Sequence, residues 1–266
     1  MSTPRHTPSP AHPSGWSGPK PPNTPSDPVS KFPARPSGSP YFGRGLVGGP
    51  GAGGVGWDFE GAVVVDQSSV GRLMTIDATL PEHDPGDELF IFLLSEKSCS
   101  AEDMEVPAGW TRLAFVGSTG TNTNNSGSYI IHKTADASEP EAVTLSRASD
   151  SSRLCTVAVR ASGVPTEVQD SATAGPSSNV RLTTSALTAV APGYQFVLGA
   201  TGNTRSNIAE VFADPPMTLL HRATGEGGDF NMSGVVYYEP VEEGLSSERR
   251  VEWSGSTNGT VLTAII

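Results

Sequence analysis

Residues 85–94 read PGDELFIFLL, a short apolar run that begins directly after a Pro-Gly turn. Residues 192–200 read PGYQFVLGA and place a second apolar run after the same dipeptide. Short runs of this kind, rich in β-branched and aromatic residues and bounded by Gly, Pro, Asn and Asp, are typical of strands. Further runs are GAVVV at 61–65, RLMTIDATL at 72–80, TRLAFVG at 111–117, SYIIHK at 128–133, AVTLS at 142–146 and LCTVAV at 154–159. No segment has a helical apolar pattern of useful length, so the sequence predicts an all-β sandwich.

The two Pro-Gly runs lie 107 residues apart, and three other landmarks recur at the same offset. These are PAGWTRL at 107–113 with DPPMTLL at 214–220, SYII at 128–131 with VVYY at 235–238, and LCTVAV at 154–159 with VLTAII at 261–266. Residues 61–159 and 168–266 are therefore predicted to be two copies of one β unit. Because the link between them is short, we expect one two-sheet, jelly-roll-like sandwich with pseudo-twofold character, and two small sandwiches are the alternative. Tyr129, Tyr237, Tyr238 and Trp253 are expected to pack in its core or rim, and Ile265 and Ile266 to lie in a sheet.

Proline is concentrated at the start of the chain, where 13 of the 23 prolines fall within residues 1–50. Proline fixes φ, removes an amide donor and restricts the residue before it, so residues 1–42 are predicted to form an extended arm without helix or central strand. The glycine-rich residues 43–56 predict a flexible hinge. The β-sandwich then occupies residues 57–266.

The charge changes sign at the same place. Residues 1–55 carry five basic residues against one acidic residue, whereas the remaining chain has 12 basic and 27 acidic residues. The acidic body argues against nucleic-acid binding, which needs clustered Lys and Arg. The arm also carries aromatic side chains that a free linker has no means to bury. We expect the arm to bind a partner protein through Arg5, Trp16, Lys31, Phe32, Arg35, Tyr41, Phe42 and Arg44, and a linker with incidental aromatics is the alternative.

The sequence offers little evidence of catalysis. It contains no HExxH, GxSxG, GxGxxG, Walker or CxxC motif. The acidic stretches PEHDPGD at 81–87 and SEKSCSAEDME at 95–105 are possible hard-cation sites, but a solvated turn and a solvated loop are the preferred interpretations. Cys99 and Cys155 are expected to be free thiols, with a disulfide as the alternative. We therefore predict a protein that is not an enzyme and has no catalytic residue, no metal and no cofactor.

Two loops are rich in Ser, Thr, Asn and Gly, namely GSTGTNTNNSGS at 117–128 and GATGNTRSN at 199–207. Loops of a sandwich often carry recognition, and these side chains could hydrogen-bond sugars. Neither loop has the exposed aromatic residue that sugar platforms normally need. Solvated hairpin loops are the preferred interpretation. No apolar run is long enough to span a bilayer, and the start of the chain lacks the apolar core of a secretory signal, so neither membrane insertion nor export is expected.

The body resembles a β-sandwich module of accessory virion proteins of tailed phages that infect actinobacteria. The resemblance rests on PGDELFIFLL, PAGWTRL, SYIIHKTADASEPEAVTLS at 128–146, AVRASGV at 158–164, PGYQFVLGA and PPMTLLHRA at 215–223. It implies a structural role in the virion, as a minor tail protein or a capsid decoration protein, with other capsid or tail subunits and further copies of this chain as partners. An adhesion module that binds a host surface or carbohydrate is the alternative function.

Overall fold

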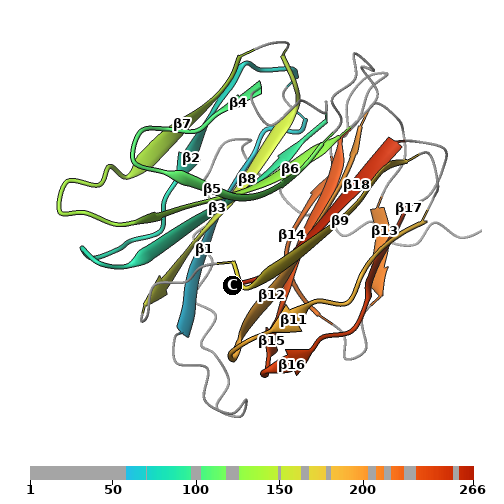
Figure 1. Ribbon diagram of the computed structural model, residues 1–266. Coiled ribbons are helices and arrows are strands. Elements are labelled where there is room, and N and C mark those ends of the chain that lie inside the picture. Colours follow the sequence, from blue (N-terminus) through green and yellow to red (C-terminus); the bar gives the residue numbers. More distant parts are fainter. Residues whose placement is uncertain are drawn as a thin grey trace, which may run out of the picture. The chain divides into compact units, whose positions relative to one another are not determined.

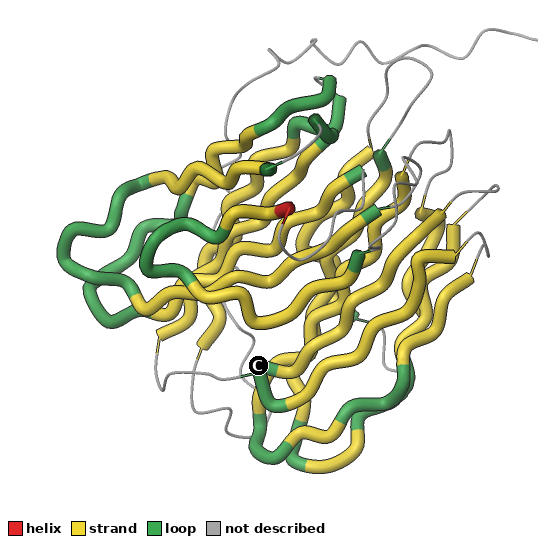
Figure 2. The backbone as a smooth tube through the Cα atoms, turned by 45° about the horizontal axis from the view of Figure 1, so that its top comes forward, coloured by secondary structure: helices red, strands yellow, loops and turns green. Residues whose placement is uncertain are grey.

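The computed structural model describes residues 58–69, 71–96, 103–117, 126–148, 151–162, 168–177, 181–202, 208–212, 217–224, 232–253 and 258–266. Every described residue belongs to the unit Pro40–Ile266. The predicted arm, the predicted hinge and the eight predicted contact residues all lie outside the described residues. The regular elements of the described part are strands (Figures 1 and 2). The predicted all-β sandwich is therefore confirmed.

The first copy of the repeat supplies eight strands that form two sheets. Its large sheet has the antiparallel order β1-β8-β3-β6-β5, and its small sheet has the order β2-β7-β4. The strands are β1 (Asp58–Asp66), β2 (Thr75–Thr79), β3 (Glu88–Ser95), β4 (Met104–Glu105), β5 (Thr111–Val116), β6 (Gly127–Thr134), β7 (Ala142–Arg147) and β8 (Leu154–Ser162).

The second copy forms an equivalent large sheet and two small ones. The large sheet has the order β14-β15-β12-β18-β9, and the small sheets are β10-β17-β13 and β11-β16. The strands are β9 (Asp170–Ser177), β10 (Arg181–Thr184), β11 (Thr188–Ala189), β12 (Gly193–Gly202), β13 (Ile208–Phe212), β14 (Thr218–Thr224), β15 (Ser233–Val241), β16 (Gly244–Leu245), β17 (Arg249–Trp253) and β18 (Asn258–Ile265).

No sheet of the described part mixes strands from the two copies, so the sheet count differs from the expected two. Each copy folds as its own sandwich of a large and a small sheet, and the two large sheets then pack face to face (Figure 1). The physical reason lies in the burial of the central strands. A strand buried on both faces needs a layer on each side, so each large sheet requires both its own small sheet and the large sheet of the other copy.

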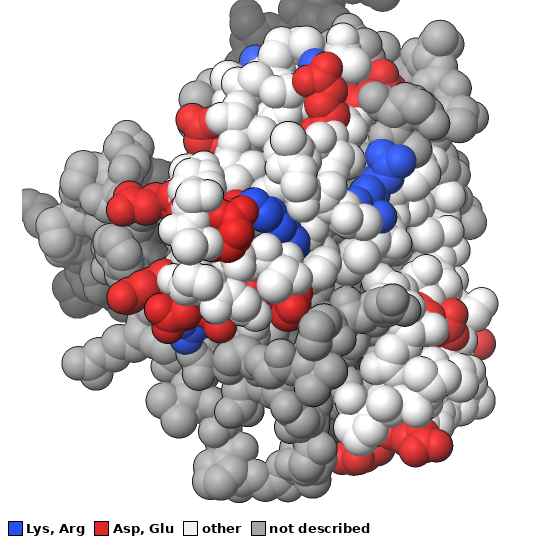
Figure 3. All heavy atoms as spheres, turned by 60° about the vertical axis from the view of Figure 1, so that its left-hand side comes forward, with Lys and Arg blue, Asp and Glu red and all other residues white. Residues whose placement is uncertain are grey.

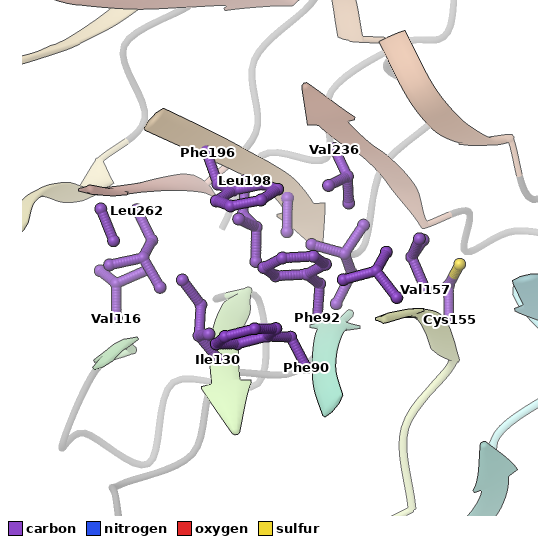
Figure 4. Packing of buried hydrophobic residues seen from close by; sticks show 14 of the residues in the cluster. Phe90, Phe92, Val116, Ile130, Cys155, Val157, Phe196, Leu198, Val236 and Leu262 are labelled. Carbon is purple, nitrogen blue, oxygen red and sulfur yellow. The ribbon is translucent and has the colours of Figure 1, made fainter. Parts of the chain in front are cut away.

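The two large sheets share one hydrophobic core, which we call the central core (Figure 4). Phe90, Phe92 and Leu94 of β3 point into it, and Phe196 and Leu198 of β12 meet them from the other copy. Its other buried members are Val116, Ile130, Cys155, Val157, Val159, Ala161, Ala200, Ala223, Met232, Val236, Leu262, Ala264 and Ile266. The central core thus joins the two copies.

The alternate residues of the central strands face outward and are also covered. Leu89, Ile91 and Leu93 of β3 pack with Ile76, Ala78, Leu80, Met104, Val143 and Leu145 from the small sheet and its flanks. In the second copy, Val197 of β12 packs with Trp253 and Val251 of β17. Burial on both faces explains why the stretch PGDELFIFLL is continuously apolar rather than alternating.

The strand pairings of the first copy recur in the second. Phe92 pairs with Ile130 between β3 and β6, and Leu198 pairs with Val236 between β12 and β15. Both strands are therefore displaced by 106 residues between the copies. The predicted duplication is thus visible in the register of the ladders as well as in the sequence.

Even an irregularity of the sheet is repeated. In β5 the ladder to β6 slips between Arg112 and Ala114, and in β14 the ladder to β15 slips between Leu219 and His221. These residues correspond at an offset of 107. Each copy therefore has a β-bulge at the same place in its edge strand.

The single offset of 107 expected for all landmarks needs correction. It holds for β5 and β14, whereas β3 and β6 are displaced by 106. Strand β8 is displaced by 105, because Cys155 pairs with Leu94 where Thr260 pairs with Ala200. Connections of slightly different length absorb these changes without altering which residues pair.

The aromatic side chains and the last two residues lie where the sequence predicts. Tyr129, Tyr237 and Trp253 are buried, and Tyr238 packs against the central core. Ile265 and Ile266 are buried as well, and the backbone of Ile266 exchanges two hydrogen bonds with Tyr194, at 2.9 and 3.0 Å. Among the described residues, no helix has the length and apolarity to cross a membrane.

Candidate functional site

The described body contains one group of side chains with the composition of a metal or catalytic site. Asp66 at the end of β1, Cys155 in β8 and His221 in β14 bring a carboxylate oxygen, a sulfur and a ring nitrogen within 4.8 Å of one another. It is the only such group of three or more among the residues that the structure describes. Two of its members belong to the first copy and one to the second, so the group lies where the copies meet.

The β-ladder of the first copy sets the position of two of these residues. Asp66 and Cys155 are directly paired between β1 and β8, so their side chains leave the same face of the sheet. That face is the one covered by the second copy, because Cys155 is a member of the central core. Cys155 is labelled at the border of the core in Figure 4, and its thiol is free.

The bulge in β14 sets the position of His221. Leu220 is the extra residue of the bulge and packs against the central core, and His221 next to it pairs with Val236, which also faces the central core. A bulge of this type lets two successive side chains approach the same face. His221 Nε2 consequently reaches Asp66 Oδ2 at 3.0 Å, although the two residues are 155 positions apart.

The electrostatics of the group differ between the carboxylate and the thiol. Burial alone would raise the pKa of Asp66, but hydrogen bonds from His221 and Ser68 outweigh it and hold that pKa below its usual range. Complete burial, followed by the nearby charge of Asp66, raises the pKa of the Cys155 thiol well above its usual value. At neutral pH the group therefore contains a charged carboxylate and a protonated thiol.

These properties do not suit a cysteine nucleophile. A reactive cysteine needs a lowered pKa and access to substrate, since the thiolate is the attacking species. Cys155 has no exposed surface, and its pKa is shifted in the opposite direction. The same three donor types are, however, those of zinc sites.

In the two acidic stretches considered as cation sites, the described residues form hydrogen bonds with other groups of the protein. In 81–87, the ring nitrogen Nδ1 of His83 lies 2.7 Å from the carbonyl oxygen of Pro81, and Asp87 accepts a hydrogen bond from the amide of Asp84 at 2.8 Å. This is the capped turn before β3 that the sequence favours. In 95–105, Glu96 is fully buried and accepts from Arg72 at 2.9 Å. Residues 97–102 lie outside the described part.

Several other charged side chains of the body are buried in pairs. Glu88 contacts His132 and accepts from Thr134 at 3.1 Å, and Arg249 of β17 donates to Glu239 of β15. Burial lowers the pKa of Arg249. Each acid here has a partner inside the protein, so these pairs tie neighbouring strands together.

One face of the body carries mostly acidic charge. On the side of the molecule shown in Figure 3, Asp and Glu side chains are spread across the described surface, and Lys and Arg are fewer. The negative charge that the sequence assigns to the body is therefore exposed there. Most of the polar loop 117–128 and residues 203–207 of the second polar loop lie outside the described residues, so the carbohydrate alternative gains no geometry from them.

The sequence gives no local sign of the Asp66, Cys155 and His221 group. No two of these residues are close in sequence, and no metal-binding spacing connects them. The duplication is the only indication in the sequence. It predicts that the two copies pack against each other, and His221 immediately follows a strand position that is apolar in both copies. Identifying the group requires the sheet order and the bulge.

Comparisons of the chain with protein-family models, with curated proteins and with solved structures find no match.

Proposed function

We propose that this protein is a non-catalytic structural component of a tailed-phage virion, either a minor tail protein or a capsid decoration protein. In this proposal the residues 57–266 form the displayed body, and the arm of residues 1–42 lies along neighbouring subunits. Trp16, Phe32, Tyr41 and Phe42 act as its anchors, and Arg5, Lys31, Arg35 and Arg44 pair with acidic groups of the partner. The partners are other virion subunits, including further copies of this chain.

The observation that carries the proposal is the central core shared by the two copies. It makes the body one block whose central sheets are covered by side chains on both faces, and such a block suits a mechanical or spacing role. The contacts of Glu88 with His132 and of Arg249 with Glu239 add further connections between strands inside this block. The resemblance to virion modules adds support from the sequence.

The arm supports the proposal through its composition. An extended proline-rich segment loses less conformational entropy on binding than a fully flexible one, because its φ angles are already fixed. Aromatic and arginine side chains are the residue types that dominate protein interfaces. A basic arm also complements the acidic surface of another copy of the same body.

The experiment is incorporation of variants into particles by a phage that lacks its own copy of the gene. Trp16, Phe32, Tyr41 and Phe42 are all changed to Ala in the full-length chain, and the expected result is a folded, soluble protein that is lost from purified virions. The matched control changes Val190 and Leu245 to Ser, because these apolar side chains are exposed on the body at 69% and 76%. We expect this control to be incorporated normally.

Two outcomes would contradict the proposal. Normal incorporation of the arm variant would show that the arm is not the attachment segment. Saturable binding of the full-length protein to host cells or to purified host glycans, with no presence in virions, would favour the adhesion function instead.

A further inference from the structure

We propose that Asp66, Cys155 and His221 bind one zinc ion, which fastens the first copy of the repeat to the second. The site is independent of the proposed virion role, since it depends only on side chains of the body. Its ligands come from β1, β8 and β14. The ion would therefore cross-link the two large sheets at the edge of the central core.

The geometry of the three donors is close to that of a zinc site. Zinc binds sulfur, imidazole nitrogen and carboxylate oxygen at about 2.0–2.3 Å in tetrahedral geometry, which places ligand atoms about 3.3–3.8 Å apart. The donor atoms here lie within 4.8 Å of one another, with His221 and Asp66 at 3.0 Å. Shifts of the donor atoms by up to about 1 Å bring all three to the spacing of zinc ligands. Water supplies the fourth ligand.

The donor set selects the class of metal. Calcium and magnesium prefer oxygen ligands and gain nothing from a thiol or an imidazole. A mixed set of sulfur, nitrogen and oxygen suits zinc and related borderline ions such as Co²⁺. The carboxylate is also oriented, because the amide of Ser68 donates to Asp66 Oδ1 at 2.9 Å and leaves Oδ2 facing His221.

The site has a route to solvent and a sealed side. The side chain of Asp66 is 27% exposed and that of His221 is 21% exposed, whereas Cys155 is fully buried. An ion can therefore enter past Asp66 and His221 and meet the sulfur at the inner end, where its binding displaces the thiol proton to solvent. The open coordination position would lie on the outer side, where water is present.

The duplicated fold provides an internal comparison. β5 contacts β9 and β18 as β14 contacts β1 and β8, so a second, related junction exists between the copies. At that junction Ala114 takes the place of His221, and Thr260 takes the place of Cys155. Opposite Thr260 the backbone of β9 is irregular, with Gly175 at a φ of 94°.

Among the residues that the structure describes, no group of metal-binding side chains lies at the second junction. Ser126 donates to the carbonyl of Ala200 at 2.6 Å and shares a hydrogen bond with Thr260 at 2.9 Å. The packing of the copies therefore does not require ionisable residues at such a junction. The presence of Asp66, Cys155 and His221 together at the other junction needs a different reason, and metal binding supplies it.

The test uses the full-length, reduced protein and Co²⁺ as a spectroscopic probe for zinc. A thiolate bound to Co²⁺ gives a charge-transfer band in the near ultraviolet, and we expect this band to saturate at one ion per chain and to disappear when Zn²⁺ is added. At free Zn²⁺ about 100 times Kd, the midpoint of thermal unfolding should rise by roughly 5–10 °C.

Variants identify the ligands. Cys155→Ser should abolish the band, and His221→Gln and Asp66→Asn should each weaken Zn²⁺ binding by about tenfold or more. Cys99→Ser is the matched cysteine control and His132→Gln the matched histidine control, and both should bind as the parent does. His221→Gln alters a partly exposed side chain, so it remains informative if Cys155→Ser fails to fold.

The proposal is overturned if the parent protein gives no thiolate band and no thermal shift with Zn²⁺. It is equally overturned if Cys99→Ser abolishes the band while Cys155→Ser retains it, or if His221→Gln binds zinc as tightly as the parent.

Discussion

The ring of Phe92 in the first copy lies against the ring of Phe196 in the second, with 4.7 Å between the ring centroids and 35° between the ring planes. Both side chains are buried, and both strands that carry them occupy the middle of a large sheet. Tilted contacts of this kind are favourable beyond the area that they bury. The pair therefore couples the stability of one copy directly to that of the other.

Replacing Phe92 with Ala should destabilise the whole body. Phe→Ala changes in a core cost about 3–5 kcal/mol, because apolar contacts are lost and a cavity remains. Since the central core is shared, we expect the two copies of the variant to unfold in one transition, with its midpoint at a lower urea concentration than in the parent. Fluorescence of variants that retain only Trp110 or only Trp253 follows each copy separately. Leu245→Ser is the control and should change stability by less than about 0.5 kcal/mol. Two separate transitions in the parent would contradict this coupling.

Replacing Gly193 with Ala should also be destabilising, because there is no room for a Cβ atom at this position. A Cβ atom at Gly193 would lie 2.4 Å from the backbone carbonyl oxygen of Ile266, which side-chain rotation does not relieve. We expect a loss of about 1–3 kcal/mol in the free energy of unfolding, measured by urea denaturation. At Gly127 the nearest atoms would be 3.4 Å away, so Gly127→Ala is the matched control. Equal stability of the two variants would show that the end of the chain moves aside freely.

Breaking the buried pair of Arg249 and Glu239 should cost more than removing it. Arg249→Met leaves the Glu239 carboxylate in a buried position without its charged partner, and such a change costs about 3–5 kcal/mol. The double variant Arg249→Met with Glu239→Leu should recover most of that loss, because no uncompensated charge remains. Thermal and urea unfolding of the single and double variants measures the difference. A double variant that is as unstable as the single one would assign the effect to packing rather than charge.

Asp136 should titrate at unusually low pH. Hydrogen bonds from the hydroxyl and amide of Ser138, at 2.7 and 2.8 Å, and from Lys133 at 3.0 Å lower the pKa of Asp136 from 3.8 to about 2. A lowered folded-state pKa means that the contribution of Asp136 to stability is fully present above pH 3.8 and is lost as the pH falls toward about 2.

The carboxyl resonance of Asp136, followed by NMR between pH 1 and pH 6, reports this titration. Ser138→Ala should move the pKa of Asp136 upward, since the Ser138 side chain is the largest cause of the shift. The control Thr144→Ala removes a hydroxyl that donates to Asp77 at 2.6 Å, and it should leave Asp136 unchanged. A pKa of Asp136 near 3.8 in the parent would contradict the hydrogen bonding described for this turn.

The strands and the duplication could be predicted from the sequence because both depend on local patterns. The apolar runs that follow the dipeptides Pro85-Gly86 and Pro192-Gly193 each become the central strand of their sheet. The arrangement of layers could not be predicted in the same way. A run that is apolar at every position indicates burial on both faces without showing which strands provide the cover.

The Asp66, Cys155 and His221 group could not be predicted from the sequence, for a related reason. Its members meet only after two sheets have formed, a bulge has turned His221 toward the central core, and the copies have packed. Each step depends on contacts between residues that are far apart in the chain, and such contacts produce no recognisable motif spacing in the sequence. The two acidic stretches, which do have a local pattern, are the ones that sequence reasoning identified.

The repeated bulge in β5 and β14 also bears on the origin of the two copies. Because it falls between corresponding residues in both copies, Arg112 and Ala114 in one and Leu219 and His221 in the other, one origin in a common ancestral unit explains it more simply than two identical insertions. The histidine has no counterpart in the first copy, where the position is Ala114. The bulge is therefore most simply a feature of the ancestral unit, whereas the histidine distinguishes the second copy from the first.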